Sequence, residues 1–200
     1  LTELLFRGNS LLMKGLLNNS FLKLIRLFPV LMLIGCSSYA PMPTVQSVDL
    51  QRFMGDWYVV ANIPTFIEKE AFNPLENYDL QDDGSIATTF TFNKGALDGP
   101  LKTYRPTGYI KDTETNALWG MQFIWPFKGD YRIVYLDENY QNTIIAREAR
   151  DYVWVMSRQA EISQRQFDRF MLIIQQLGYD TSELQRPAHR KPQKGDVERL

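Results

Sequence analysis

The stretch Gly55-Asp56-Trp57-Tyr58 begins the first run of residues with the composition of a β-strand. The glycine lets the backbone turn tightly into the strand, and the tryptophan adds a large apolar side chain whose N–H needs a partner when buried. Roughly a hundred residues later, Arg158 ends the last strand-like run, where its guanidinium can stack on the indole. We therefore expect a β-barrel whose first and last strands meet at a closed floor marked by Gly55, Trp57 and Arg158.

Eight short runs rich in aromatic and β-branched residues follow one another, and no apolar periodicity of helical length occurs before residue 160. They cover residues 57–62, 76–80, 86–92, 101–110, 117–124, 131–136, 143–147 and 152–158. Turn sequences such as Asp82-Asp83-Gly84 and Lys128-Gly129-Asp130 separate them. This order predicts an all-β fold, an eight-stranded antiparallel up-and-down β-barrel.

Three motifs resemble those of the lipocalin family. Gly55-Asp56-Trp57-Tyr58 resembles its Gly-x-Trp signature, and Val155-Met156-Ser157-Arg158 resembles the motif that carries its arginine. Asp137-Glu138-Asn139-Tyr140 is similar to its middle motif, with Leu136 where many members have threonine. Three motifs in the right order are more specific than one. The resemblance is greatest to the bacterial outer-membrane lipoprotein lipocalins, and it implies a barrel that holds one small hydrophobic ligand.

The first 35 residues have the layout of a secretory signal peptide. Lys14, Lys23 and Arg26 precede an apolar run at 27–34, which ends at the small residue Gly35. The run has about half of the ~20 residues that a transmembrane helix needs. We expect residues 1–35 to be a leader that is removed, with Met13 as the true start and residues 1–12 as a gene-model extension.

The sequence Leu33-Ile34-Gly35-Cys36 resembles a bacterial lipobox. This implies that Cys36 becomes the amino-terminal residue and carries acyl chains such as palmitate, because several chains on one residue give stable membrane attachment. Ser37, in place of aspartate, implies export to the outer membrane, with the barrel facing the periplasm. The alternative is that Cys36 is a buried or free thiol. Residues 36–47, rich in Ser and Pro, are expected to form an extended lipidated tether.

The composition excludes several kinds of site. Cys36 is the one cysteine and His189 the one histidine, so the chain cannot form an internal disulfide or a multi-ligand zinc or haem site. We expect no metal and no cofactor. Without residues 1–35, 18 basic residues remain against 22 acidic ones, which argues against nucleic acid as a partner. Two hundred residues, 44% of them hydrophobic, suit one domain with appendages.

One helix is predicted after the barrel. Ser163-Gln164-Arg165-Gln166 has the form of a capping box, and apolar residues repeat at helical spacing from Phe167 to Leu177, before Gly178. We expect this helix to pack outside the barrel, and the alternative for its apolar stripe is a membrane surface. The domain therefore covers residues 48–187, and the charged residues 188–200 are expected to be a disordered tail.

Residues 63–75 form the longest break between predicted strands and contain several apolar side chains. The resemblance implies a lid over the barrel mouth, and long loops are often functional. Ordinary packing of this loop on the rim is the alternative.

Period-two alternation along the strands, counted from Trp57 and Arg158 and from the family pattern, selects the inward-facing residues. These ligand-binding candidates are Tyr78, Thr88, Phe90, Phe92, Tyr131, Ile133, Tyr135, Trp154 and Met156. Such large, mostly aromatic side chains suit an acyl chain whose polar head stays near the mouth. The alternative is that they fill the interior and leave no cavity.

The resemblance implies that the ligand is a fatty acid or lysophospholipid, held without covalent chemistry. An enzyme is not expected, because His189 lies in the predicted tail and the chain has no nucleophile elbow or phosphate-binding glycine loop; a lipocalin-fold enzyme remains a lesser alternative. The main rival is a closed-barrel structural or adaptor lipoprotein. Exposed aromatic residues such as Trp125 and Phe127 would then contact an envelope complex, or a second copy of the chain in a homodimer.

Overall fold

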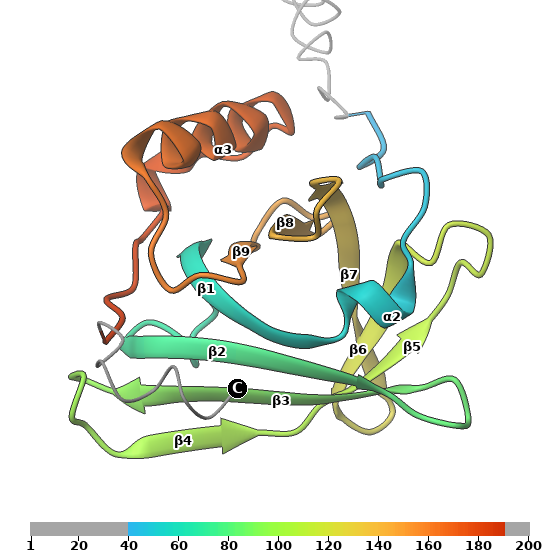
Figure 1. The fold of residues 1–200 in the computed structure, drawn as a ribbon, viewed down its shortest axis with the longest axis horizontal. Helices are drawn as coiled ribbons and strands as arrows, with labels where there is room; N and C mark the ends of the chain where they lie inside the picture. The colour runs from blue at the N-terminus through green and yellow to red at the C-terminus, as the bar shows by residue number, and fades with distance from the viewer. Residues whose placement is uncertain (1–39, 191–200) are drawn as a thin grey trace, which may run out of the picture. The chain divides into compact units, whose positions relative to one another are not determined.

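Nine antiparallel strands close into a barrel in the computed structural model, which describes residues 40–190 (Figure 1). The sheet order is β2-β1-β9-β8-β7-β6-β5-β3-β4, and pairing of β2 with β3 completes the ring. The elements are α2 (Leu50–Phe53), β1 (Gly55–Ile63), β2 (Ala71–Leu80), β3 (Ile86–Lys94), β4 (Leu101–Tyr104), β5 (Thr107–Ile110), β6 (Leu118–Ile124), β7 (Phe127–Leu136), β8 (Asn142–Ala146), β9 (Val153–Ser157), α3 (Gln164–Gln176) and the 3₁₀ turn η2 (Thr181–Glu183).

The predicted up-and-down barrel is confirmed, with one strand more than expected. The run predicted as a single strand, 101–110, is divided into β4 and β5 at Arg105-Pro106, because proline has no N–H to continue a ladder. Both halves still pair with β3, through Phe90 with Tyr104 and Ile86 with Gly108. The interruption leaves the barrel closed.

Residues 40–49 lie against the barrel wall, which differs from the extended tether expected at 36–47. Met42 and Val48 are buried, and the amide of Val45 donates to the carbonyl of Ile133 at 2.9 Å. The serine and proline content that suggested a free linker is therefore outweighed by burial of the apolar residues between them. Beyond this segment, the short helix α2 brings Phe53 into the core.

Strand β2 begins at Ala71, so the loop predicted at 63–75 is shorter than expected. Phe72 pairs with Asn93 of β3, and a β-bulge follows before Leu75. Asn73, within the bulge, has φ of 51°, a left-handed conformation that asparagine tolerates better than most residues. The connection between β1 and β2 is thus reduced to residues 64–70.

Helix α3 packs outside the barrel, as predicted. Its N-terminus has the complete capping box: Ser163 accepts from the amide of Gln166, whose side chain accepts from the amide of Ser163. Phe170 and Ile174 are buried in a cluster with side chains of β1, β8 and β9. Gly178 ends the helix with φ of 89°, a conformation that glycine adopts without strain.

The chain after η2 lies along the barrel as far as residue 190. Gln185 pairs with Asn62, the carbonyl of Ala188 accepts from the amide of Asn73 at 2.7 Å, and the His189 ring bonds the carbonyl of Val59 at 2.9 Å. The disordered tail expected from residue 188 is therefore wrong for 188–190, since backbone groups of the barrel hold these residues.

Several predictions fall on residues that are not described. The leader at 1–35, acylation of Cys36, the first part of the tether and the tail at 191–200 lie outside residues 40–190. Within 40–190, none of the helices is long and apolar enough to cross a membrane.

Candidate ligand-binding site

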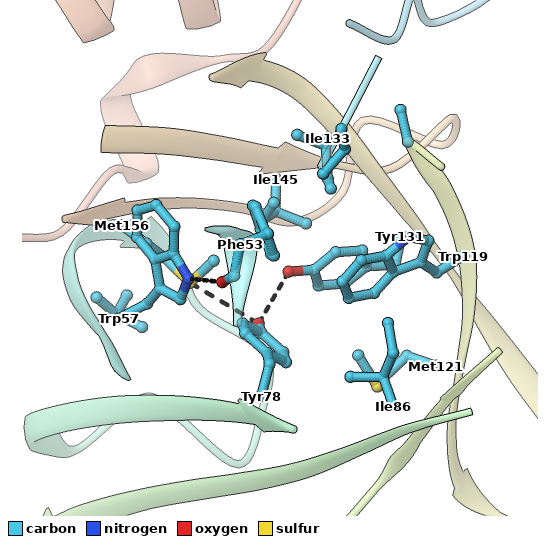
Figure 2. Packing of buried hydrophobic residues seen from close by; sticks show 13 residues of the cluster. Phe53, Trp57, Tyr78, Ile86, Trp119, Met121, Tyr131, Ile133, Ile145 and Met156 are labelled. Atoms are coloured by element: carbon cyan, nitrogen blue, oxygen red, sulfur yellow. Dashed lines mark hydrogen bonds between the residues drawn. The ribbon is translucent and has the colours of Figure 1, made fainter. Parts of the chain in front are cut away.

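Trp57 closes the floor of the barrel. Its side chain is fully buried, and its indole N–H donates to the carbonyl of Phe53 at 2.8 Å. The ring of Phe53 lies 5.1 Å from that of Trp57, so the short helix α2 supplies both the hydrogen-bond acceptor and part of the plug (Figure 2). This satisfies the polar group that a buried tryptophan brings with it.

Arg158 covers the outer side of the plug. Its guanidinium carbon lies 3.8 Å from the centre of the Trp57 ring, a distance suited to a cation–π contact. Its nitrogens donate to the carbonyl oxygens of Asp56 at 2.6 Å, Arg52 at 3.0 Å, Phe53 at 3.0 Å and Met54 at 2.8 Å. The end of the last strand is thereby tied to the beginning of the first.

Gly55 occupies the turn between helix α2 and Trp57. Its φ of 90° is rarely adopted by other residues, and an added Cβ would lie 3.5 Å from Nη1 of Arg158. Glycine is therefore required here by backbone conformation more than by space. The structure thus brings together all three residues that the sequence assigned to the floor.

A layer of aromatic rings lies above the floor. Tyr78 and Tyr131 point toward one another across the barrel, with their hydroxyl oxygens 2.8 Å apart (Figure 2). Trp119 stacks on Tyr131 with ring centres 5.1 Å apart. Burial raises the pKa of both tyrosines well above the usual value for a phenol, so these hydroxyls remain protonated and neutral at physiological pH.

A cavity of about 400 Å³ lies above this aromatic layer, which is within the range of small-molecule sites. Five of the nine predicted residues line it: Tyr78, Phe90, Tyr131, Trp154 and Met156. Most of the lining surface is apolar and includes Met121 of β6 and Ile145 of β8. The interior is therefore only partly filled, in contrast to the alternative of a solid core.

Three predicted residues are buried but do not line the cavity. Thr88 donates to the sulfur of Met121 at 3.8 Å, and Phe92 stacks on Tyr104 with an interplanar angle of 11°. Ile133 is fully buried in the cluster around the floor. Alternation assigned these side chains to the inside of the barrel. It does not reveal which inward-facing side chains are covered by their neighbours and which remain exposed to the cavity.

Tyr135 was predicted to face inward, and this is wrong. Its ring packs edge-on against Phe170 of helix α3, with centres 5.6 Å apart, outside the barrel. The cause is a β-bulge in the pairing of β7 with β8 between Ile133 and Tyr135. A bulge inserts one residue and reverses the alternation beyond it.

Three carboxyl groups in the cavity lining were not predicted: Asp130, which pairs with Arg132 at 2.9 Å, and two glutamates. Glu76 of β2 and Glu68 of the β1–β2 connection both line the cavity. The carboxylate of Glu68 accepts from the amide and hydroxyl of Thr65, at 2.8 and 2.6 Å, and from the indole of Trp154 at 2.8 Å. Alternation counted from Tyr78 places Glu76 inside the barrel. Glu76 was not predicted to line the cavity because an apolar interior was expected.

Residues 64–70 and the β6–β7 hairpin form the mouth. Phe66, Ile124 and Phe127 line the outer part of the cavity, and all three are largely exposed, as is Trp125 at 82%. Thr65, Ile67 and Glu68 of the same connection also line the cavity, and a lid function for this loop stays a prediction. The rim is therefore markedly apolar.

The metal-ligating side chains and the histidine of the described residues lie apart from one another or from the cavity. No group of three or more His, Cys, Asp or Glu side chains able to hold a metal ion occurs among residues 40–190. His189 lies outside the cavity, edge-on to Tyr58. Within this range, the arrangement supports enclosure of a ligand.

Comparison with known families agrees with this geometry. A family model described as a lipocalin-like domain matches residues 48–189. The chain belongs to the lipocalin family. This lipocalin is 27% identical over 157 residues to the outer membrane lipoprotein Blc of Escherichia coli (strain K12), covering 76% of this chain and 87% of the relative. It is 29% identical over 161 residues to temperature-induced lipocalin-1 of Arabidopsis thaliana, covering 76% and 83%.

Solved lipocalin structures show the same fold at low identity. Insecticyanin from the tobacco hornworm Manduca sexta matches with a TM-score of 0.60 and 14% identity, over 76% of this lipocalin and 86% of that chain. Lobster apocrustacyanin A1 matches with a TM-score of 0.57 and 11% identity, over 78% and 94%. Lipocalins are in general binding and transport proteins for small hydrophobic molecules, so membership implies hydrophobic ligand binding by this chain.

Proposed function

We propose that this lipocalin is a lipid-anchored protein of the bacterial outer membrane, facing the periplasm, that binds and carries a fatty acid or lysophospholipid without catalysing a reaction. The observation that carries the proposal is the cavity of about 400 Å³, sealed at Trp57 and open at an apolar mouth. Each buried CH₂ contributes about 0.8 kcal/mol, so a long chain offsets the entropy lost on association.

Acylation of Cys36 accounts for the proposed anchor, and the start of the described chain suggests an orientation. The carbonyl of Ala40 accepts from Arg150 at 2.7 Å, and the amide of Met42 donates to the carboxylate of Glu148 at 3.1 Å. Both partners belong to the β8–β9 connection at the mouth. Cys36 and Ala40 are four residue steps apart along the chain and so at most about 14 Å apart, so an anchor at Cys36 would hold the mouth near the bilayer.

The ligand is tested by native mass spectrometry of a soluble form without the leader and with Cys36→Ser, incubated with an extract of bacterial membrane lipids. We expect retained single-chain lipids that a delipidated control lacks. Absence of any retained lipid would contradict the carrier function. Cys36→Ser in the full-length protein should separately release it from membranes, and continued membrane association would argue against acylation as the anchor.

A second candidate function is that of an adaptor. Trp125 and Phe127 flank Pro126 at the tip of the β6–β7 hairpin and are 82% and 75% exposed, so they offer a docking contact for an envelope protein or a second copy. This candidate predicts that Trp125→Ser weakens self-association or complex formation in analytical ultracentrifugation, with no effect on lipid retention.

A further inference from the structure

Glu76 is the unexplained group in the cavity. It projects from β2, one alternation step above Tyr78, and keeps some accessible surface because it lines the open volume. Its Oε2 atom is buried and has no hydrogen-bond partner among the described residues. Buried polar atoms without partners are rare and unfavourable, so a bound molecule that supplies the missing partner would stabilise this site.

The surroundings of Glu76 favour a positive charge. Burial, and then the charge of Glu68, raise the pKa of Glu76 to about 8. Among the described residues that line the cavity, Arg147 is the one cationic side chain, and it lies at the mouth, 3.1 Å from the carboxylate of Asp151. Asp130 also lines the cavity but is paired with Arg132 at 2.9 Å. Glu68 and Glu76 have no cationic partner among the described residues that line the cavity, which disfavours an anionic head group beside Glu76.

The rings around Glu76 add to this preference. Tyr78, Phe90, Tyr104 and Trp154 line the same cavity, and the face of an aromatic ring attracts a cation. Glu76, in the middle of β2, lies deeper in the barrel than the exposed rim, which carries Phe66 and Phe127. An unpaired carboxyl group inside and apolar rings at the rim are the reverse of the polarity expected for a ligand held with its head at the mouth. A hydrocarbon tail therefore suits the rim, and an amine suits the interior.

We infer that Glu76 recognises the protonated amine of a single-chain amphiphile, which enters the barrel amine first and buries its tail along the apolar outer part of the cavity. This inference rests on the proposed hydrophobic-ligand function and narrows it: the ligand carries an ammonium group, and a free fatty acid binds less well. Glu68, held by Thr65 and Trp154, contributes negative charge without giving up its own hydrogen bonds.

The test compares three probes of equal chain length, dodecylamine, dodecanol and laurate, below their micelle concentrations at pH 7. Dissociation constants are measured by titration calorimetry with the leaderless Cys36→Ser protein. We expect dodecylamine to bind at least about tenfold more tightly than the other two. Glu76→Gln should reduce this advantage to less than about twofold and leave dodecanol binding unchanged. Glu70→Gln, which changes an exposed glutamate of the β1–β2 connection, should preserve it.

Proton release gives a second readout. The titratable groups around Glu76 are Glu68 from the connection, Tyr78 from its own strand and Tyr131 from β7. The two tyrosines keep their protons because burial raises their pKa values. Binding of an ammonium to a protonated Glu76 should therefore release about one proton at pH 7, measured in buffers of different ionisation enthalpy, and Glu76→Gln should release none.

Three outcomes would overturn the inference. Equal affinity for the amine and the alcohol would show that Glu76 does not recognise the head group. Tighter binding of laurate, lost in Arg147→Gln, would place an anionic head at the mouth, where Nε of Arg147 is buried without a partner. Failure of all three probes to bind would remove the hydrophobic-ligand function itself, and the inference with it.

Discussion

The hydroxyl oxygens of Tyr78 and Tyr131 meet 2.8 Å apart although their strands, β2 and β7, are not neighbours in the sheet. Besides this bond, the Tyr78 hydroxyl contacts the sulfur of Met156 at 4.0 Å. The bond spans the barrel and forms part of the base of the cavity. Removal of one partner leaves the other hydroxyl without this hydrogen bond in a largely apolar environment, which is unfavourable.

Tyr131→Phe should accordingly lower the free energy of unfolding by about 1–2 kcal/mol. Tyr78→Phe should have an effect of similar size, and the double variant should lose less than the sum of the two, because no orphaned hydroxyl remains. Urea unfolding of the four proteins measures this coupling. Strict additivity would show that the hydrogen bond contributes nothing.

Arg158→Ala should lower the free energy of unfolding by about 2–4 kcal/mol, because four backbone carbonyl oxygens lose a charged donor. Arg158→Lys should recover only part, since an ammonium cannot reproduce the planar fork of donors. Arg165→Ala, at an exposed position of helix α3, is the control and should stay within about 0.5 kcal/mol. Thermal and urea unfolding both report the difference.

Phe170→Ala should destabilise the protein by about 3–5 kcal/mol, because it opens a hole between helix α3 and the barrel wall. Leu172→Ala provides a matched control on the same helix, since Leu172 is 59% exposed and its truncation opens no hole. Equal effects of the two substitutions in urea unfolding would contradict docking of the helix on the barrel.

Glu76 should make the empty barrel less stable as pH rises from about 6.5 to 8. Its pKa of about 8 in the folded state lies above that of the unfolded chain, so the folded state binds more protons in this window. Stability therefore falls with pH by at most about 1.4 kcal/mol per unit. Burial lowers the pKa of His189, which acts in the opposite direction below about pH 6.5.

The comparison of wild type with Glu76→Gln isolates this contribution, because His189 is common to both. The variant should be the more stable protein at pH 8, and the difference should shrink toward pH 5. Unfolding curves at closely spaced pH values provide the measurement, and parallel pH profiles for the two proteins would show that Glu76 is not protonated in the folded state.

Trp125 should report approach of the mouth to a membrane. Trp57 and Trp119 are fully buried and Trp154 is partly buried, whereas Trp125 is 82% exposed. Addition of vesicles of phosphatidylethanolamine and phosphatidylglycerol to the leaderless Cys36→Ser form should shift its emission to shorter wavelength, and Trp125→Phe should abolish that shift. Leu172→Ser, on helix α3, should preserve it. An unchanged emission in all three proteins would favour a protein partner for the hairpin.

The floor could be predicted from the sequence because its chemistry is local and specific. A glycine turn precedes the tryptophan of the first strand, and an arginine follows the last strand. Contact between these two side chains was therefore expected, and Arg158 lies over Trp57. Helix α3 could be predicted equally well, since its capping box and apolar spacing depend on residues that are close together in the sequence. Helix α2 was not, because four residues are too few to show a period.

The cavity could be predicted only in part, because alternation holds strictly only along a regular strand. It assigned Tyr78, Tyr131 and Met156 correctly to the cavity wall. It failed at Tyr135, beyond a bulge whose position depends on the pairing of β7 with β8. Glu76 was missed for a different reason, because a carboxyl group inside an apolar barrel departs from the usual pattern. Such departures tend to occur at sites where a protein binds a ligand.

Because Trp57 and Phe53 close one end of the barrel, the cavity formed by the described residues opens at the other end. A molecule that has entered must depart by the way it came, so an occupied barrel has to empty before it can be loaded again. Entry and exit then share the mouth between residues 64–70 and the β6–β7 hairpin, so a ligand-binding barrel of this form works as a container that is filled and emptied in turn, and not as a conduit.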